Sequence, residues 1–140
     1  MKLIKFFYFL FSVFSINFSL AQNCDLPPNY TGNTGSNMSI FLTATFISSL
    51  NATDENAYMV ALTESGLVIG ASSVYGVNQT ELAVWGDDST TDEIVDGAST
   101  TEAVSFQLVN GTDLYDVVMP TTVSYNTNAL VLQLAAAQLT

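Results

Sequence analysis

Short runs of alternating apolar and polar residues, separated by turn residues, recur along most of the chain. In the first run, from Met38 to Phe46, apolar residues occupy every second position, and Phe41 is the one addition to that pattern. A two-residue period is typical of a half-buried β-strand. Further β-rich runs span 57–63, 67–74, 81–85, 103–109, 114–119 and 121–133. The pattern predicts an all-β fold of about seven strands.

Turn signals between these runs indicate how the strands connect. Residues Glu64 to Gly66 separate two adjacent runs and predict a hairpin. Asn110-Gly111 stands between two others, and this dipeptide is the strongest short hairpin signal, because both residues accept positive φ. We therefore expect an antiparallel, immunoglobulin-like β-sandwich. The expected core residues are Ile40, Leu42, Val60, Leu62, Val68, Val84, Phe106, Leu108, Val117 and Val131.

The first 21 residues have the features of an export signal. Lys2 and Lys5 form a cationic start, an apolar run follows, and Ser19 and Ala21 supply the small residues before a cleavage site. We expect cleavage after Ala21 and a secreted or cell-surface protein; a signal anchor is the alternative. The rest of the chain holds no apolar run of membrane length, so no membrane insertion is expected after signal removal.

The remaining chain is expected to form one domain with an arm and a tail. Residues 22–37 read as an extended N-terminal arm or linker, 38–133 as the β-sandwich domain, and 134–140 as a tail with some helical character. The chain could be the first part of a longer parent protein. Cys24 is the only cysteine, which excludes an internal disulfide; it could pair with a cysteine elsewhere or stay a free thiol.

The charge composition excludes several classes of function. Both basic residues lie in the signal, there is no histidine, and 13 acidic residues remain, so removal of the signal changes the formal charge from −11 to −13. Nucleic acids and anionic membranes are bound through Lys and Arg, and neither partner is expected here. Serine and cysteine nucleophiles paired with histidine, Schiff-base lysines and histidine zinc sites are excluded as well. We expect no enzymatic activity.

Six of the 13 acids fall within 87–102, in a polar segment between two expected strands. Carboxylates that lie close together repel one another, and calcium, which takes six to eight oxygen ligands, would relieve that repulsion. The candidate calcium ligands are Asp87, Asp88, Asp92 and Asp96. The spacing does not fit an EF-hand. A solvated acidic loop and a paired-carboxylate active site are the alternatives.

Two aromatic residues are candidates for stacking on a ligand such as a sugar. Trp85, the only tryptophan, closes one expected strand beside Gly86, and Tyr75 follows another. An exposed ring could form a stacking platform, whereas a buried ring would fill the core of the sandwich. The core position is the preferred interpretation for Trp85.

Several segments resemble a β-sandwich module of large secreted and cell-surface proteins of Gram-negative bacteria, which commonly end in a type IX secretion sorting domain. The resemblance rests on NTGSNMSIFL (33–42), AYMVALTESGLVIG (57–70), AVWGDDSTTDEIVDG (83–97) and EAVSFQL (102–108). It implies an extracellular, multi-domain, adhesive or structural context and brings no assigned activity.

Together these features predict a non-catalytic extracellular structural or adhesive module, whose partner is an extracellular protein, a glycan or another copy of the chain. One alternative is a calcium-assisted carbohydrate-binding module that uses the acidic segment with Trp85 or Tyr75. The other is a self-assembling surface subunit in which the arm 22–37 adds to the edge of a neighbouring sheet.

Overall fold

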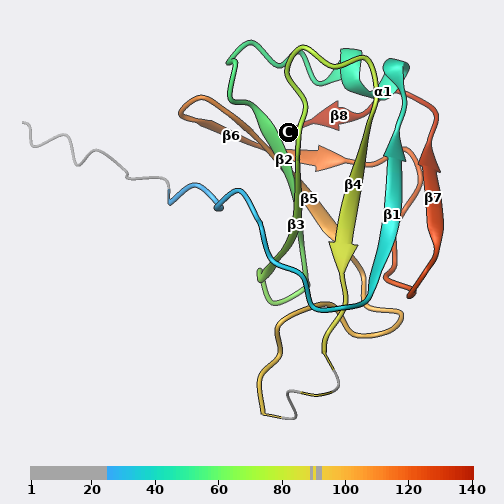
Figure 1. Ribbon diagram of the computed structural model, residues 1–140. Helices are drawn as coiled ribbons and strands as arrows, with labels where there is room; N and C mark the ends of the chain where they lie inside the picture. Colours follow the sequence, from blue (N-terminus) through green and yellow to red (C-terminus); the bar gives the residue numbers. More distant parts are fainter. Residues whose placement is uncertain (1–24, 89, 91–92) are drawn as a thin grey trace, which may run out of the picture.

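The computed structural model describes residues 25–88, 90 and 93–140; the expected signal and Cys24 lie outside this part. Within it, eight strands and one short helix form two packed sheets (Figure 1). No helix among the described residues is long and apolar enough to cross a membrane. The elements are β1 (Asn37–Leu42), α1 (Ala44–Ser49), β2 (Tyr58–Leu62), β3 (Val68–Ser73), β4 (Thr80–Trp85), β5 (Ser105–Asn110), β6 (Asp113–Val118), β7 (Leu130–Gln133) and β8 (Gln138–Leu139).

The two sheets have different sizes and enclose one core. The three-stranded sheet has the order β4-β1-β7, and the five-stranded sheet has the order β3-β2-β5-β6-β8. Every strand pair is antiparallel except β1 with β7, which run parallel. The predicted all-β sandwich is therefore confirmed as an architecture, with eight strands instead of about seven and with one parallel pair.

Both predicted hairpins are present, and the second is shifted by one residue. Asn110 pairs with Asp113, so the two turn residues are Gly111 and Thr112. Gly111 has φ 68°, at the first turn position, where positive φ favours glycine. The side-chain oxygen of Asn110 instead accepts hydrogen bonds from the backbone N–H groups of Thr53 and Asp54, at 3.0 and 2.9 Å. Asn110 thus fixes the loop before β2.

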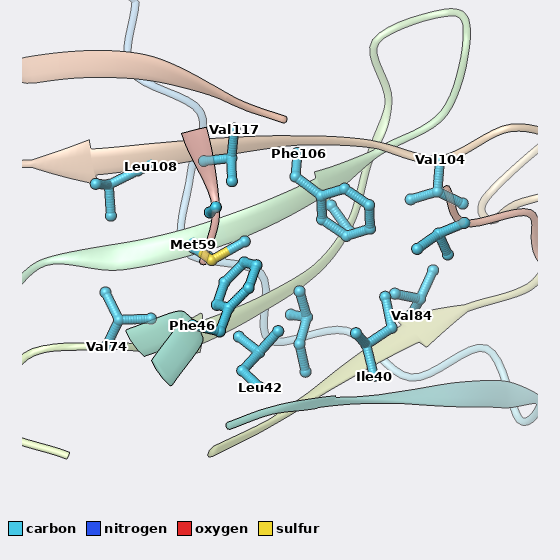
Figure 2. Close-up of a cluster of buried hydrophobic side chains, with 14 of the residues drawn as sticks. Ile40, Leu42, Phe46, Met59, Val74, Val84, Val104, Phe106, Leu108 and Val117 are labelled. Carbon is cyan, nitrogen blue, oxygen red and sulfur yellow. The ribbon is translucent and has the colours of Figure 1, made fainter. Parts of the chain in front are cut away.

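The first strand ends earlier than the alternation predicts. β1 stops at Leu42, and residues 44–49 form α1 at one end of the sandwich. The ring of Phe46 is fully buried and points from α1 into the core, toward Met59 (Figure 2). The prediction that Ala44 and Phe46 belong to the strand was wrong, because a helix at this position lets Phe46 close the open end of the core.

Three of the predicted core residues lie on the outer face of the five-stranded sheet. Side chains alternate along a strand, so Val60 and Leu62 point away from Met59 and Ala61, which line the core. Leu62 and Val68 border a groove together with Pro27 of the arm, and the Tyr58 hydroxyl donates a hydrogen bond to the Pro27 carbonyl at 2.7 Å. The described part of the arm therefore lies over part of this outer face. Val60 is nevertheless fully buried, and the remaining predicted core residues are buried as well, except Val131, which is half-buried against the core.

The C-terminal residues belong to the sandwich, which corrects the prediction of a helical tail after residue 133. β8 pairs with β6 and forms an edge of the five-stranded sheet, and the backbone N–H of Ala137 donates to the Ser49 hydroxyl at 2.8 Å. Just before it, the fully buried Gln133 side chain bonds both backbone groups of Thr121, at 3.1 and 2.9 Å. Gln133 replaces a missing strand partner there, so it satisfies backbone groups that burial would otherwise leave unpaired.

Candidate functional site

The predicted acidic segment forms a loop between β4 and β5 at the end of the sandwich opposite α1 (Figure 1). A bridge between Gly86 and Ala98 closes its base. The N–H of Asp87 donates to the Ala98 carbonyl, and the N–H of Ala98 donates to the Trp85 carbonyl, both at 3.0 Å. The two ends of the loop are therefore held side by side, as in a short piece of sheet.

Close backbone approach at this base depends on Gly97. A Cβ atom added at Gly97 would lie 2.2 Å from the carbonyl carbon and oxygen of Gly86. Beneath the bridge, the buried ring of Tyr125 directs its hydroxyl to Ser36 and Thr127, at 3.2 Å each. The base of the loop is therefore packed as tightly as a protein interior.

Two carboxylates of the loop bind backbone N–H groups across it. Asp87 Oδ1 accepts from the N–H of Asp96, and Asp96 Oδ1 accepts from the N–H of Asp88, both at 3.0 Å. The amide dipoles stabilise the two negative charges, as cations do in other proteins. An acidic loop can therefore be compact in a chain that carries no cationic side chain after Lys5.

Asp88 makes a local turn with the residues that follow it. Its Oδ1 accepts from the N–H and the hydroxyl of Thr90, both at 2.8 Å. The backbone hydrogen bond, followed by the hydroxyl, holds the pKa of Asp88 below its ordinary value. The two hydrogen bonds thus favour the ionised form of Asp88.

The predicted calcium ligands are only partly brought together. Asp87, Asp88 and Asp96 share the loop, whereas Asp92 lies outside the described residues. Among the residues that the structure describes, no group of three or more acidic, histidine or cysteine side chains is arranged to hold a metal ion. Glu102 contacts a different region: its two oxygens accept from the N–H groups of Ser99 and Glu64, at 2.8 and 3.1 Å. It ties the loop to the β2–β3 turn.

The arm passes this loop before it enters β1. The Thr34 hydroxyl donates to the Gly86 carbonyl, and the Gly86 N–H donates to the Ser36 carbonyl at 2.9 Å. Partial burial, and then the charge of Asp96, raise the pKa of the Tyr30 phenol. Arm and acidic loop therefore form one continuous surface.

This contact gives a testable result. Asp96→Asn is expected to lower the pKa of Tyr30, because the amide removes the repelling charge and keeps the oxygen that accepts from Asp88. The phenolate absorbance is followed against pH, and Tyr30 is isolated by subtracting the titration of Tyr30→Phe. Asp113→Asn is the control, since Asp113 lies in the β5–β6 hairpin and does not act on Tyr30. Equal shifts in both variants would contradict the contact.

The two stacking candidates lie far apart. Tyr75 follows β3 and precedes β4, and it is 46% exposed, whereas Trp85 is the last residue of β4, a strand of six residues that spans about 17 Å at about 3.4 Å per residue. Trp85 is half-buried and points outward, since Leu82 and Val84 on the same strand fill the core. The preferred interpretation of Trp85 as a core residue was therefore wrong. Of the two rings, only Trp85 adjoins the acidic loop.

A second surface was missed by the sequence analysis: the outer face of the three-stranded sheet. In β7, Leu130 and Leu132 are 64% and 47% exposed, and Leu134 just beyond is 66% exposed. Their register places them beside Ser39 and Phe41 of β1. In residues 129–134, apolar residues occur in both of the alternating sets of strand positions. Only one set can face the core, so this pattern was the sequence signal for an exposed apolar face.

This outer face carries little charge. On the other side of β1, Ala83 and Glu81 of β4 pair with Ser39 and Phe41. Glu81 accepts a hydrogen bond from the Ser39 hydroxyl at 2.5 Å. None of the 13 acids of the chain lies after Asp116, so β7 and the segments around it are uncharged. The result is an exposed apolar surface on an otherwise strongly acidic protein.

Comparison of the chain with protein-family models, with curated proteins and with solved structures found no match.

Proposed function

We propose that the protein is a non-catalytic extracellular module with a structural or adhesive role, and that it binds through the outer face of the three-stranded sheet. The observation that carries the proposal is the exposure of Leu130, Leu132 and Leu134 beside Phe41. Contiguous exposed apolar surface on a small domain marks an interaction site more often than scattered apolar residues do. On the outer face of the other sheet, the arm lies beside Leu62 and Val68, and among the described residues of its five strands only Val118 is an exposed large hydrophobic.

The arrangement of the acidic loop also supports a non-catalytic role. General acid and base catalysis by carboxylates requires groups that can reach a substrate and exchange protons with it. Asp87 and Asp96 instead use an oxygen each to hold the backbone of the loop together. Their geometry is suited to shaping a surface.

The test compares binding by two matched variants. The purified protein is applied to a glycan array and to immobilised copies of itself. Phe41→Ser is expected to weaken the binding to glycans or to the immobilised copies, because it interrupts the apolar face. Val118→Ser changes an exposed residue of β6 and is expected to leave that binding unchanged. Cleavage of a glycoside or peptide that Asp87→Asn or Asp96→Asn abolishes would overturn the non-catalytic proposal.

A second candidate function is calcium-assisted carbohydrate binding at the acidic loop. It is favoured by the position of Trp85, whose outward ring directly precedes Gly86 and Asp87 at the base of the loop. In this proposal Asp87, Asp88 and Asp96, with Asp92, supply oxygen ligands and Trp85 stacks on a sugar.

Thermal unfolding with and without millimolar calcium tests this candidate. A bound ion at about 100 times its Kd adds about 2.7 kcal/mol to the unfolding free energy, so the melting temperature should rise. Asp88→Asn should remove that rise. Sodium at matched ionic strength is the control for screening, and an equal rise with sodium would reject the calcium site.

Self-assembly through the arm is a further form of the structural proposal. The hydrogen bonds from Tyr58 to Pro27 and from Thr34 to Gly86 lie within one chain, and two copies could exchange arms and keep both contacts.

A further inference from the structure

We propose that β7 is a pairing edge for a second copy of this chain, so that two three-stranded sheets join into one continuous six-stranded sheet. The strand order across the dimer would be β4-β1-β7 followed by β7-β1-β4 of the second copy. The inference deepens the proposed function, because it names the partner of the same sheet.

The four sheet edges of the sandwich differ in how they are protected. β3 and β4 are edges of different sheets, and they lie against each other: a Cβ atom added at Gly70 of β3 would lie 2.2 Å from the Ala83 carbonyl oxygen of β4. β8 is only two residues long. Short edges and covered edges are common ways to prevent unwanted strand pairing.

Within the part of the chain that the structure describes, β7 has none of these protections. It is the outermost strand beside β1, and Figure 1 shows no strand beyond it. Natural edge strands are also guarded by lysine, proline or inward charge, whereas Ala129 to Leu134 contains no charged residue and no proline. In a chain with 13 acids, an uncharged edge avoids the repulsion that two acidic copies would otherwise meet there.

The hydrogen bonds of β7 show which backbone groups face outward. The carbonyls of Ala129 and Gln133 accept from the N–H groups of Ser39 and Thr43 in and after β1. Because backbone direction alternates along a strand, the N–H and C=O groups of Leu130 and Leu132 point to the free edge. These groups are available to an added strand.

An antiparallel pair centred on Leu132 satisfies the symmetry of a dimer. Leu132 would pair with Leu132 of the second copy, and Leu130 with its Leu134. Each pair exchanges two N–H to C=O hydrogen bonds and sets leucine side chains directly opposite one another. The interface is the same patch on both copies, as a twofold axis requires.

Sedimentation velocity over a range from micromolar to about 1 mM tests the proposal, with reductant present so that Cys24 cannot link copies. The wild-type protein is expected to show a monomer–dimer equilibrium. Leu132→Lys should weaken dimerisation by more than about tenfold, because two like charges would meet at the twofold axis. Tyr75→Lys is the matched control: Tyr75 is 46% exposed against 47% for Leu132, and dimerisation should be unchanged.

A second variant separates backbone pairing from loss of apolar surface. Leu132→Pro removes the outward N–H and leaves the bonds to β1 in place, so it should also give monomers. In the wild-type protein, amide hydrogen exchange should slow at Leu130 and Leu132 as concentration rises, and this measurement does not depend on how the proline variant folds.

Several results would overturn the proposal. These are a wild-type protein that stays monomeric throughout, a dimer that survives both Leu132 variants, or a dimer lost only on removal of residues 22–37, which would indicate arm exchange. If the wild-type protein is monomeric and binds a glycan, and Phe41→Ser loses that binding, the dimer is rejected and the proposed function stands.

Discussion

Phe46→Ala is expected to lower the free energy of unfolding by about 3–5 kcal/mol, the range for truncating a buried phenylalanine. Phe46 is fully buried, and it is the residue with which α1 closes the core (Figure 2). Small domains have a total stability of about 5–15 kcal/mol, so the variant would lose a large share of it. Urea denaturation followed by circular dichroism measures the change.

The matched control for this variant is Phe41→Ala. Phe41 is half-buried on the outer face of the three-stranded sheet, so the same truncation leaves no internal cavity. It is expected to cost clearly less than Phe46→Ala. Equal losses in the two variants would show that Phe46 does not fill the core.

Gly70→Ala is expected to lower the free energy of unfolding by about 3 kcal/mol, at the upper end for overpacking, because the obstructing atoms belong to the backbone. The added Cβ would lie 2.2 Å from the Ala83 carbonyl oxygen and 3.4 Å from the Cα of Val84. β3 and β4 would have to separate, and with them the two sheets on that side. The same denaturation experiment measures the loss.

Gly76→Ala provides the comparison. Gly76 has φ 70°, and no atom of the described residues lies within 4 Å of an added Cβ, so only the backbone penalty of about 1–2 kcal/mol applies. A Gly70→Ala variant as stable as the wild type would mean that β3 and β4 are not in close contact.

The acidic loop illustrates how this chain manages charge without cations. Asp87 and Asp96 each bind a backbone N–H on the opposite side of the loop, and Asp88 binds Thr90 beside it. Backbone amides therefore stabilise these carboxylates, a contribution that the charge composition of the chain does not reveal. Whether calcium adds to this arrangement is the question that the thermal experiment addresses.

The sequence by itself determined the fold class and most of the strand positions. Alternation and turn residues placed the hairpin of β2 and β3, the strand β4 and the turn near Gly111, because these signals depend on neighbours along the chain. The absence of cationic side chains after Lys5 was also evident without any structure.

Only the tertiary structure decided which face of each strand is covered, and by what. Alternation separates two faces and does not say which one meets the core, so Leu62 and Val68 were assigned to the core although they border the groove beside the arm. Val60 lies on the same outer face and is nevertheless fully buried, as predicted. The roles of α1 and β8 depend on contacts with residues distant in the sequence, as when Ala137 bonds Ser49. The exposure of the leucines of β7 also depends on the tertiary structure. β1 pairs with one edge of that strand, and none of the described residues pairs with its other edge.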